Sequence, residues 1–175
     1  MKISIDSRTI QPGEYFIPVK GENFDGRSYI KDAIQKGGIL LDVDLWKYAE
    51  QYRRKLRCHV IGITGSAGKT TCKDMLASVL GQTYNVKKTQ ENLNNEFGVP
   101  LTILSADDTT DILIVEMGLR KKGDMTFLTQ MVQPSHVVIT CIGLTHIEFF
   151  QSQRQLAIAK AEIYRKARAW QTTSR

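Results

Sequence analysis

The sequence has no apolar run long enough to cross a membrane, and its first residues lack the hydrophobic segment of a secretion signal. We therefore expect a cytoplasmic protein that does not insert into a membrane. No segment is of low complexity, and 42% of the 175 residues are apolar, which is compatible with a packed core. This length is that of one ordinary domain, or of a small domain joined to part of another.

Cysteine is scarce. Cys58, Cys72 and Cys141 are odd in number and far apart, and no two of them have the C-x-x-C spacing. This distribution argues against a disulfide framework and against a zinc site. We expect three free thiols in a reducing compartment.

The charge balance is basic, with a formal net charge of +6. Such an excess suggests an anionic partner. The densest basic clusters, at 53–57, 120–122 and 165–168, contain no interleaved aromatic residues of the kind that stack on bases. Nucleic-acid binding is an alternative that rests on net charge alone, and we expect no nucleic-acid partner.

A glycine-rich stretch organises the chain. An apolar run at His59–Ile63 leads into it, and a helical pattern at 72–80 follows it. This order of strand, turn and helix is typical of a phosphate-binding loop, in which backbone N–H groups and the helix N-terminus face phosphate oxygens. The predicted nucleotide-binding residues are Gly65, Ser66, Ala67, Gly68, Lys69, Thr70 and Thr71.

Two side chains of this loop have a predicted role. Lys69 would reach the terminal phosphates, and the Thr70 hydroxyl would bind Mg²⁺. The loop is shorter than the strict G-x-x-x-x-G-K-[ST] pattern, because Ile63 stands where the first glycine belongs. The alternative is an ordinary strand-to-helix turn.

The segment from 58 onward alternates strand-like and helical runs. Strands are predicted at 59–64, 84–88, 112–116 and 136–141. This alternation predicts an α/β fold with a partial P-loop-type parallel sheet and flanking helices. Ligands of such sheets gather at the carboxyl ends of the strands, so we expect the site in the loops that begin there.

The first 57 residues are predicted to form a small α/β unit of their own. Strands are expected at 2–5, 15–19 and 39–43, and a helix at 28–35. Pro18 indicates a sheet edge or a strand end. Asp44 can cap a helix whose aromatic stripe, Trp46, Ala49, Tyr52 and Leu56, is typical of core. The loops at 6–8 and 20–27 hold polar and glycine residues, where binding groups tend to lie.

Loop residues after the other strands have suitable chemistry. Glu116 ends a strand, and its carboxylate could hold the Mg²⁺ bound by Thr70, or it could be a surface glutamate. His146 lies in a later loop, and a lone histidine is more often structural than a ligand. His136, at the start of its strand, is expected to be structural. The amides of Asn92, Asn94 and Asn95 could bind a polar substrate or satisfy turn backbone.

Several of these stretches together resemble the Mur ligases, the ATP-dependent amide ligases that build the peptidoglycan stem peptide. The likeness lies in residues 62–71, 89–100, 116–124 and 143–163, together with Asp6-Ser7-Arg8 and residues 20–26 near the N-terminus. The resemblance implies a shortened UDP-sugar-binding domain at 1–57 and an incomplete central ATP-binding domain at 58–175. It also favours the member that adds D-Ala-D-Ala to UDP-N-acetylmuramoyl-tripeptide.

The resemblance assigns further roles to individual residues. It implies ATP and two Mg²⁺ ions, with catalytic roles for Lys69, Glu116, His146 and Lys160. Thr70 and Glu116 would hold one Mg²⁺, and His146 and a carbamylated Lys160 would hold the second. A substrate carboxylate would attack the γ-phosphate, and an amine would then displace phosphate from the acyl phosphate. The implied substrate-binding residues are Ser7, Arg8, Lys20, Asn23, Phe24, Asp25, Asn92, Asn94 and Asn95.

The Mur ligases have three domains, and this sequence ends soon after Lys160. We therefore expect the rest of the central sheet and the C-terminal domain to be absent, and no amide bond to be formed by the chain alone. A second chain could supply the missing part. The alternative is a non-catalytic nucleotide-binding or scaffold module derived from a ligase.

Overall fold

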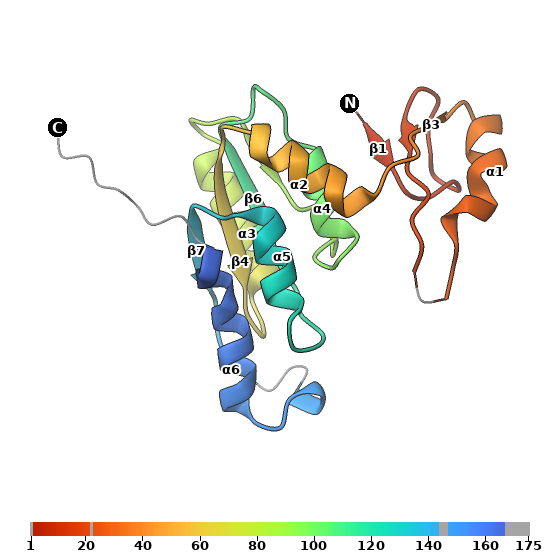
Figure 1. The fold of residues 1–175 in the computed structure, drawn as a ribbon. Coiled ribbons are helices and arrows are strands. Elements are labelled where there is room, and N and C mark those ends of the chain that lie inside the picture. Colours follow the sequence, from red (N-terminus) through yellow and green to blue (C-terminus); the bar gives the residue numbers. More distant parts are fainter. Residues whose placement is uncertain (1, 22, 144–146, 167–175) are drawn as a thin grey trace.

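The computed structural model describes residues 2–21, 23–143 and 147–166. Its first part is a small parallel sheet with helical segments on one side (Figure 1). β1 (Ile3–Ser4), β2 (Tyr15–Phe16) and β3 (Ile39–Leu40) pair in the order β1-β2-β3. These helical segments are the 3₁₀ helix η1 (Gly26–Tyr29) and the α-helix α1 (Ile30–Gln35). Phe16 and Ala33 are buried between sheet and helix in a core of their own.

The strands of this first sheet are shorter than predicted, with two residues each. β2 is the central strand and ends two residues before Pro18, so Pro18 marks a strand end and not a sheet edge. A proline has no N–H for the ladder, which fits the end of pairing at this point. The predicted helix at 28–35 is in fact a 3₁₀ turn followed by α1.

The second part is a four-stranded parallel sheet. It consists of β4 (His59–Thr64), β5 (Val86–Lys88), β6 (Ile112–Glu116) and β7 (His136–Ile139), in the order β5-β6-β4-β7. β4 and β6 have the predicted bounds, whereas β5 and β7 are shorter than the predicted strands. The α/β fold with parallel sheets and flanking helices is confirmed.

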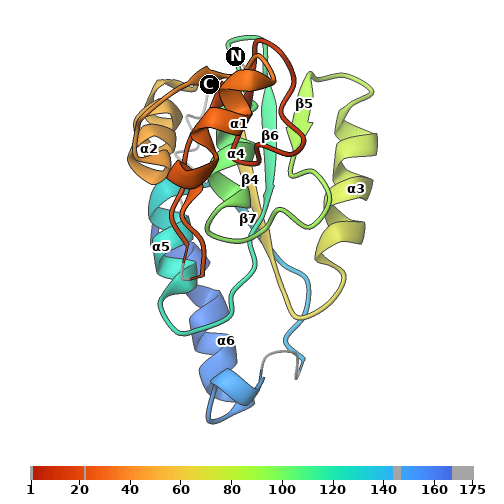
Figure 2. The ribbon, with the colours of Figure 1, turned by 90° about the vertical axis from the view of Figure 1, so that its right-hand side faces the viewer.

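Helices cover both faces of this sheet (Figure 2). α3 (Lys69–Leu80) lies on one face, and α4 (Gly98–Leu104), α5 (Asp124–Val132) and α2 (Leu45–Lys55) lie on the other. Along β6, Ile114 packs with the residues of α3, and Leu113 and Val115 pack on the opposite side. A parallel strand with both faces covered is apolar throughout, and for this reason the apolar run 112–115 predicted the strand.

α2 connects the two parts. The Asp44 side chain accepts a hydrogen bond from the Lys47 N–H and caps the helix, as predicted. Ala49 is fully buried, and Tyr52 donates its hydroxyl hydrogen to the Ala106 carbonyl at 2.8 Å. The apolar face of α2 therefore packs on α4 and α5, and the predicted core role of the aromatic stripe is confirmed.

The last described elements follow β7. They are η2 (Ile147–Phe149), α6 (Gln153–Ala161) and η3 (Glu162–Lys166). Ser152 caps α6 by accepting from the Gln155 N–H, and Glu162 accepts a 2.6 Å hydrogen bond from Thr126 of α5. Within the described residues, no helix is long and apolar enough to cross a membrane.

Candidate nucleotide-binding site

The strand register brings the predicted site residues to one edge of the sheet. Ile63 of β4 pairs with Glu116 of β6, and Thr64 pairs with Ile139 of β7. The loop that follows β4 therefore begins between the ends of two neighbouring strands. This is the crevice in which parallel α/β sheets bind ligands.

Two glycines set the shape of this loop. Gly65 has φ +151° and Gly68 has φ +76°, both in the region that side chains disfavour. A Cβ at Gly65 would also collide with the Thr140 hydroxyl. Gly68 immediately precedes α3, so the helix begins at Lys69 with its first N–H groups directed at the loop.

Residues after β7 hold the loop from its other side. The Thr140 hydroxyl donates to the Ala67 carbonyl at 2.6 Å, and the Ser66 N–H donates to the Cys141 carbonyl at 2.9 Å. The Lys69 ammonium donates to the Gly65 carbonyl at 3.0 Å. Sequence reasoning missed Thr140. Its position one residue past β7 at the same sheet edge was the available signal.

Two buried hydroxyl groups of the loop have no hydrogen-bond partner among the described residues. They are those of Thr64 and Ser66. A buried hydroxyl without a partner costs stability, so such groups usually meet a ligand or water. Together with the glycine turn and the start of α3, they fit the phosphate groups of a nucleotide.

Glu116 lies at the centre of the hydrogen-bond network. Its side chain is 1% exposed. Oε2 accepts the Thr70 hydroxyl hydrogen at 3.0 Å, and Oε1 accepts from the Asn94 amide at 2.8 Å. The Glu116 N–H donates to the hydroxyl of Thr89, which is a second residue that sequence reasoning missed. A carboxylate beside a hydroxyl is the donor set that suits Mg²⁺ next to phosphate.

A buried lysine that was not predicted completes this network. The Lys73 side chain is 2% exposed, and its Nζ lies 3.7 Å from Glu116 Oε2. Lys73 lies three residues after Thr70 and three before Leu76, which packs on the sheet. This i, i+3 spacing on the apolar face of the helix was the signal that could have found it.

The three asparagines predicted as substrate-binding residues differ in their contacts. Asn94 is fixed between Glu116 and Gly118, whose N–H donates to the Asn94 carbonyl at 2.7 Å. Asn95 accepts hydrogen bonds from the N–H groups of Phe97 and Gly98. Of the two predicted alternatives, it therefore satisfies turn backbone. Asn92 is exposed, so a substrate role stays a prediction for it.

Lys160 on α6 is buried, with 2% of its surface exposed. Burial, together with the charge of Lys69, lowers the pKa of Lys160 to about 8. Among the described residues its ammonium makes no hydrogen bond and no ion pair with a carboxylate. A buried amine of lowered pKa is unusual for a helix lysine and marks Lys160 as a candidate functional group.

His146 lies outside the described residues, so its predicted role as a metal ligand stays a prediction. Within the described ranges, no group of three or more histidine, cysteine, aspartate or glutamate side chains is arranged to hold a metal ion. Thr70 and Glu116 are therefore the protein side chains that would hold the first Mg²⁺, with phosphate oxygens of the nucleotide as its other ligands.

The predicted substrate residues of the N-terminal unit lie in two loops. Ser7 is buried, and hydrogen bonds from Ser7 and Lys36 lower the pKa of Asp32. Arg8 is exposed, and its guanidinium lowers the pKa of Asp6 to about 2 through a two-point ion pair. In the second loop Lys20, Asn23, Phe24 and Asp25 are all exposed.

An aromatic cluster joins this second loop to the asparagine loop. The ring of Phe24 lies 5.9 Å from that of Phe97, which lies 5.7 Å from that of Trp46. The Trp46 indole N–H donates to the Glu96 carbonyl at 2.7 Å. The two predicted substrate loops, far apart in sequence, are therefore neighbours in the fold.

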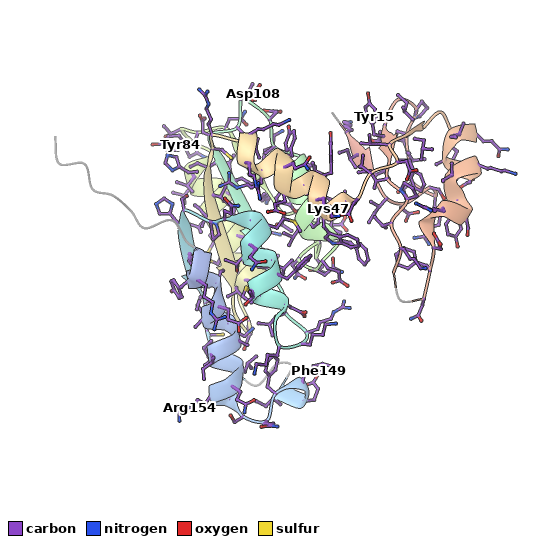
Figure 3. The ribbon with its side chains drawn as sticks, viewed as in Figure 1. Tyr15, Lys47, Tyr84, Asp108, Phe149 and Arg154 are labelled. Carbon is purple, nitrogen blue, oxygen red and sulfur yellow. The ribbon has the colours of Figure 1, made fainter. Side chains whose placement is uncertain are left out.

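Two surface hollows lie away from the glycine loop. One, of about 510 Å³, lies between α3 and β5. The other, of about 1080 Å³, lies at the amino ends of the strands, where Tyr84, Asp108 and His136 line it. Figure 3 shows Tyr84 and Asp108 at the end of the sheet opposite to Phe149 and Arg154. Neither hollow includes Lys69 or Glu116.

Curated relatives are similar in sequence to this chain over most of its length. The UDP-N-acetylmuramoyl-tripeptide–D-alanyl-D-alanine ligase of Bacillus subtilis is 39% identical over 92% of the chain, and that of Synechocystis is 36% identical over 92%. The Escherichia coli ligase of the same name is 32% identical over 93%. The chain spans about 40% of the length of these relatives.

Solved structures share the fold. A crystal structure of MurF from Acinetobacter baumannii covers 95% of the chain with a TM-score of 0.85 and 30% identity, and the chain covers 41% of it. MurF ligase from Thermotoga maritima in complex with ADP covers 95% with a TM-score of 0.81, also at 30% identity, and the chain covers 43% of it.

Two family models match the sequence and together account for nearly all of it. The model of the Mur ligase family catalytic domain matches residues 2–95, and that of the Mur ligase middle domain matches residues 63–172. The second match includes the glycine loop, Glu116 and Lys160, which the fold gathers around one edge of the sheet. The chain therefore belongs to the Mur ligase family.

Proposed function

We propose that this chain binds Mg·ATP and serves an amide ligase that adds D-Ala-D-Ala to UDP-N-acetylmuramoyl-tripeptide in cell-wall synthesis. The observation that carries the proposal is the contact of Thr70 with Glu116 beside the glycine loop. It joins a phosphate-binding turn to a buried carboxylate, as phosphoryl transfer requires. The similarity to UDP-N-acetylmuramoyl-tripeptide–D-alanyl-D-alanine ligases supports the choice of substrates.

In this proposal the residues of the loop bind and orient the nucleotide. The N–H groups of residues 65–71 and the Ser66 hydroxyl contact phosphate oxygens, and Lys69 leaves the Gly65 carbonyl to meet the terminal phosphate. Thr70 and Glu116 would hold Mg²⁺, which would supply positive charge beside the transferring phosphoryl group. A substrate carboxylate takes the γ-phosphoryl group, and the amine of D-Ala-D-Ala then displaces phosphate from the acyl phosphate.

Lys160 is proposed to carry a carbamate. Its ammonium would first lose one proton, and the free amine would then take up CO₂ and release a second proton, which converts a cation into an anion. The buried position, the lowered pKa and the lack of a carboxylate partner among the described residues support this step. The carbamate and His146 would together hold the second Mg²⁺. A carbamate carbon signal from ¹³C-bicarbonate, present in the parent and lost in Lys160→Arg, would support the assignment.

The tripeptide substrate is proposed to lie near the two N-terminal loops and the asparagine loop. The aromatic contacts of Phe24, Phe97 and Trp46 support this placement, because they bring the loops together. The division at residue 57 into a sugar-nucleotide unit and an ATP unit belongs to the same proposal. Its site of action would be the cytoplasm, since ATP is a co-substrate.

Calorimetric binding of two ligands tests the proposed function. Mg·ADP and UDP-N-acetylmuramoyl-tripeptide are both expected to bind the parent chain. Lys69→Ala is expected to weaken the first, and Phe24→Ala the second. Binding of the nucleotide alone would favour a non-catalytic nucleotide-binding module. Binding of neither would contradict the proposal.

A further inference from the structure

Lys73 is a charged side chain that the proposed chemistry does not use. It lies on α3, and its side chain is 2% exposed. Burying an ammonium group costs several kcal/mol unless polar partners compensate. A lysine kept in such a place therefore has partners that hold it there, and these partners indicate its role.

Its main partner is the carboxylate at the centre of the site. The Lys73 Nζ lies 3.7 Å from Oε2 of Glu116, whose side chain is 1% exposed. The other contacts of this carboxylate, with Thr70 and Asn94, come from neutral donors. Within the described residues, Lys73 provides the one ion pair of Glu116. A second ion pair of Lys73, with Asp74 at 3.9 Å, involves a half-exposed carboxylate.

Lys73 also holds the asparagine loop. Its ammonium donates to the Glu91 carbonyl at 3.3 Å. Glu91 has φ +44°, which is uncommon for a residue with a side chain and has to be stabilised by its surroundings. Asn94 follows this turn directly in the sequence, and its amide donates to Oε1 of Glu116. Lys73 thus contacts Glu116 directly and also the loop that supplies its second donor.

We propose that Lys73 is a positioning residue for the Mg²⁺ ligand Glu116. Its ammonium holds the carboxylate beside Thr70 and fixes the Glu91 turn, so that Asn94 contacts the same carboxylate from the other side. This inference rests on the proposed function, in which Glu116 and Thr70 hold the Mg²⁺ of Mg·ATP.

The readout is the Mg²⁺ coupling ratio, defined as the dissociation constant of ADP in EDTA divided by that in saturating Mg²⁺. Calorimetry on the full chain measures both constants. Lys73→Gln removes the charge and keeps a donor for the Glu91 carbonyl. It is expected to lower the ratio by about 10- to 100-fold, the usual effect of losing a partner of a metal ligand. The constant in EDTA is expected to change by less than about twofold, since Lys73 is not part of the glycine loop.

Two control variants separate positioning from general stability. Lys88→Gln also removes a lysine ion pair, the 2.7 Å contact of Lys88 with Asp74, and is expected to leave the ratio unchanged. Lys73→Arg keeps the positive charge that pairs with Glu116 and is expected to retain the ratio within about threefold. If Lys73→Arg lowers the ratio as much as Lys73→Gln does, and unfolds like the parent, the proposal is overturned. If Lys73→Gln does not unfold cooperatively, the arginine variant decides.

A double-mutant cycle tests whether Lys73 acts through Glu116. Glu116→Gln alone is expected to lower the ratio strongly, and adding Lys73→Gln to it is expected to change the ratio by less than about twofold. An equal effect of Lys73→Gln in both backgrounds would overturn the proposal. A parent ratio of one would instead contradict the Mg²⁺ site itself, so the two failures are distinguishable.

Discussion

The Thr70 hydroxyl donates a hydrogen bond to Oε2 of Glu116 across 3.0 Å, and this contact joins segments 46 residues apart. Thr70 comes from the first turn of α3, and Glu116 from the end of β6. Strand β6 lies between β5 and β4, so the connection from β4 through α3 to β5 crosses over the strand that ends at Glu116. The site is therefore a direct consequence of the strand order.

The Thr70 hydroxyl is expected to matter more than its methyl group. Thr70→Val removes the proposed Mg²⁺ ligand at nearly constant shape and should weaken Mg·ADP binding by about tenfold or more, with little change in EDTA. Thr70→Ser keeps the hydroxyl and should bind within about threefold of the parent. Calorimetry on both variants checks this. Equal affinities of the valine and serine variants for Mg·ADP would be inconsistent with a metal-binding hydroxyl.

Gly65 is expected to tolerate no side chain. Gly65→Ala combines an unfavourable φ with a collision at Thr140, and should lower the free energy of unfolding by about 2–4 kcal/mol. Gly123→Ala is a matched control, because Gly123 has φ +95° but no atom within 4 Å of an added Cβ. Its cost should be only the backbone strain, about 1 kcal/mol or slightly more. Urea unfolding of the two variants measures the difference, and equal losses would argue against the close approach of Thr140.

Lys160 is expected to make stability depend on alkaline pH. Its pKa is about 8 in the folded chain and 10.5 ordinarily, so the unfolded chain binds more protons between these values. Stability should therefore rise with pH from about 8 to 10.5, relative to Lys160→Met, by about 1–3 kcal/mol. Urea unfolding of both proteins across this range provides the comparison. Parallel curves would show that the buried amine is not destabilised as a cation.

The aromatic cluster is expected to join the two parts of the chain. Phe97→Ala removes the ring between Phe24 and Trp46 and should lower the free energy of unfolding by about 1–3 kcal/mol. Phe127→Ala, on the 44% exposed Phe127 of α5, should cost less than about 1 kcal/mol. Thermal unfolding of both variants tests this, and similar losses would speak against a special role of the cluster.

The sequence predicted the long elements better than the short ones. β4 and β6 were bounded correctly because buried parallel strands are apolar on both faces. β1, β2 and β3 have two residues each, and such short pairing leaves hardly any periodic pattern. Their predicted bounds were accordingly too long.

The candidate site was predictable where a residue lay at a strand end or in the glycine loop, as with Glu116, Lys69 and Thr70. Lys73 and Thr140 were missed for a different reason. A lysine in a helix is usually exposed, so its burial becomes visible only when Glu116 and the Glu91 carbonyl are placed beside it. The role of Thr140 depends on the packing of β7 against β4, which sequence alone does not specify.

Thermal unfolding with and without Mg·ATP, beside Lys69→Ala, tests nucleotide binding at the glycine loop most directly. A ligand stabilises the state that it binds, so nucleotide at about 100 times its dissociation constant adds about 2.7 kcal/mol. For a chain of this size the midpoint should rise by about 5–10 °C in the parent. In Lys69→Ala the rise should be about half as large or less. A transition that Mg·ATP leaves unchanged in the parent would contradict the account.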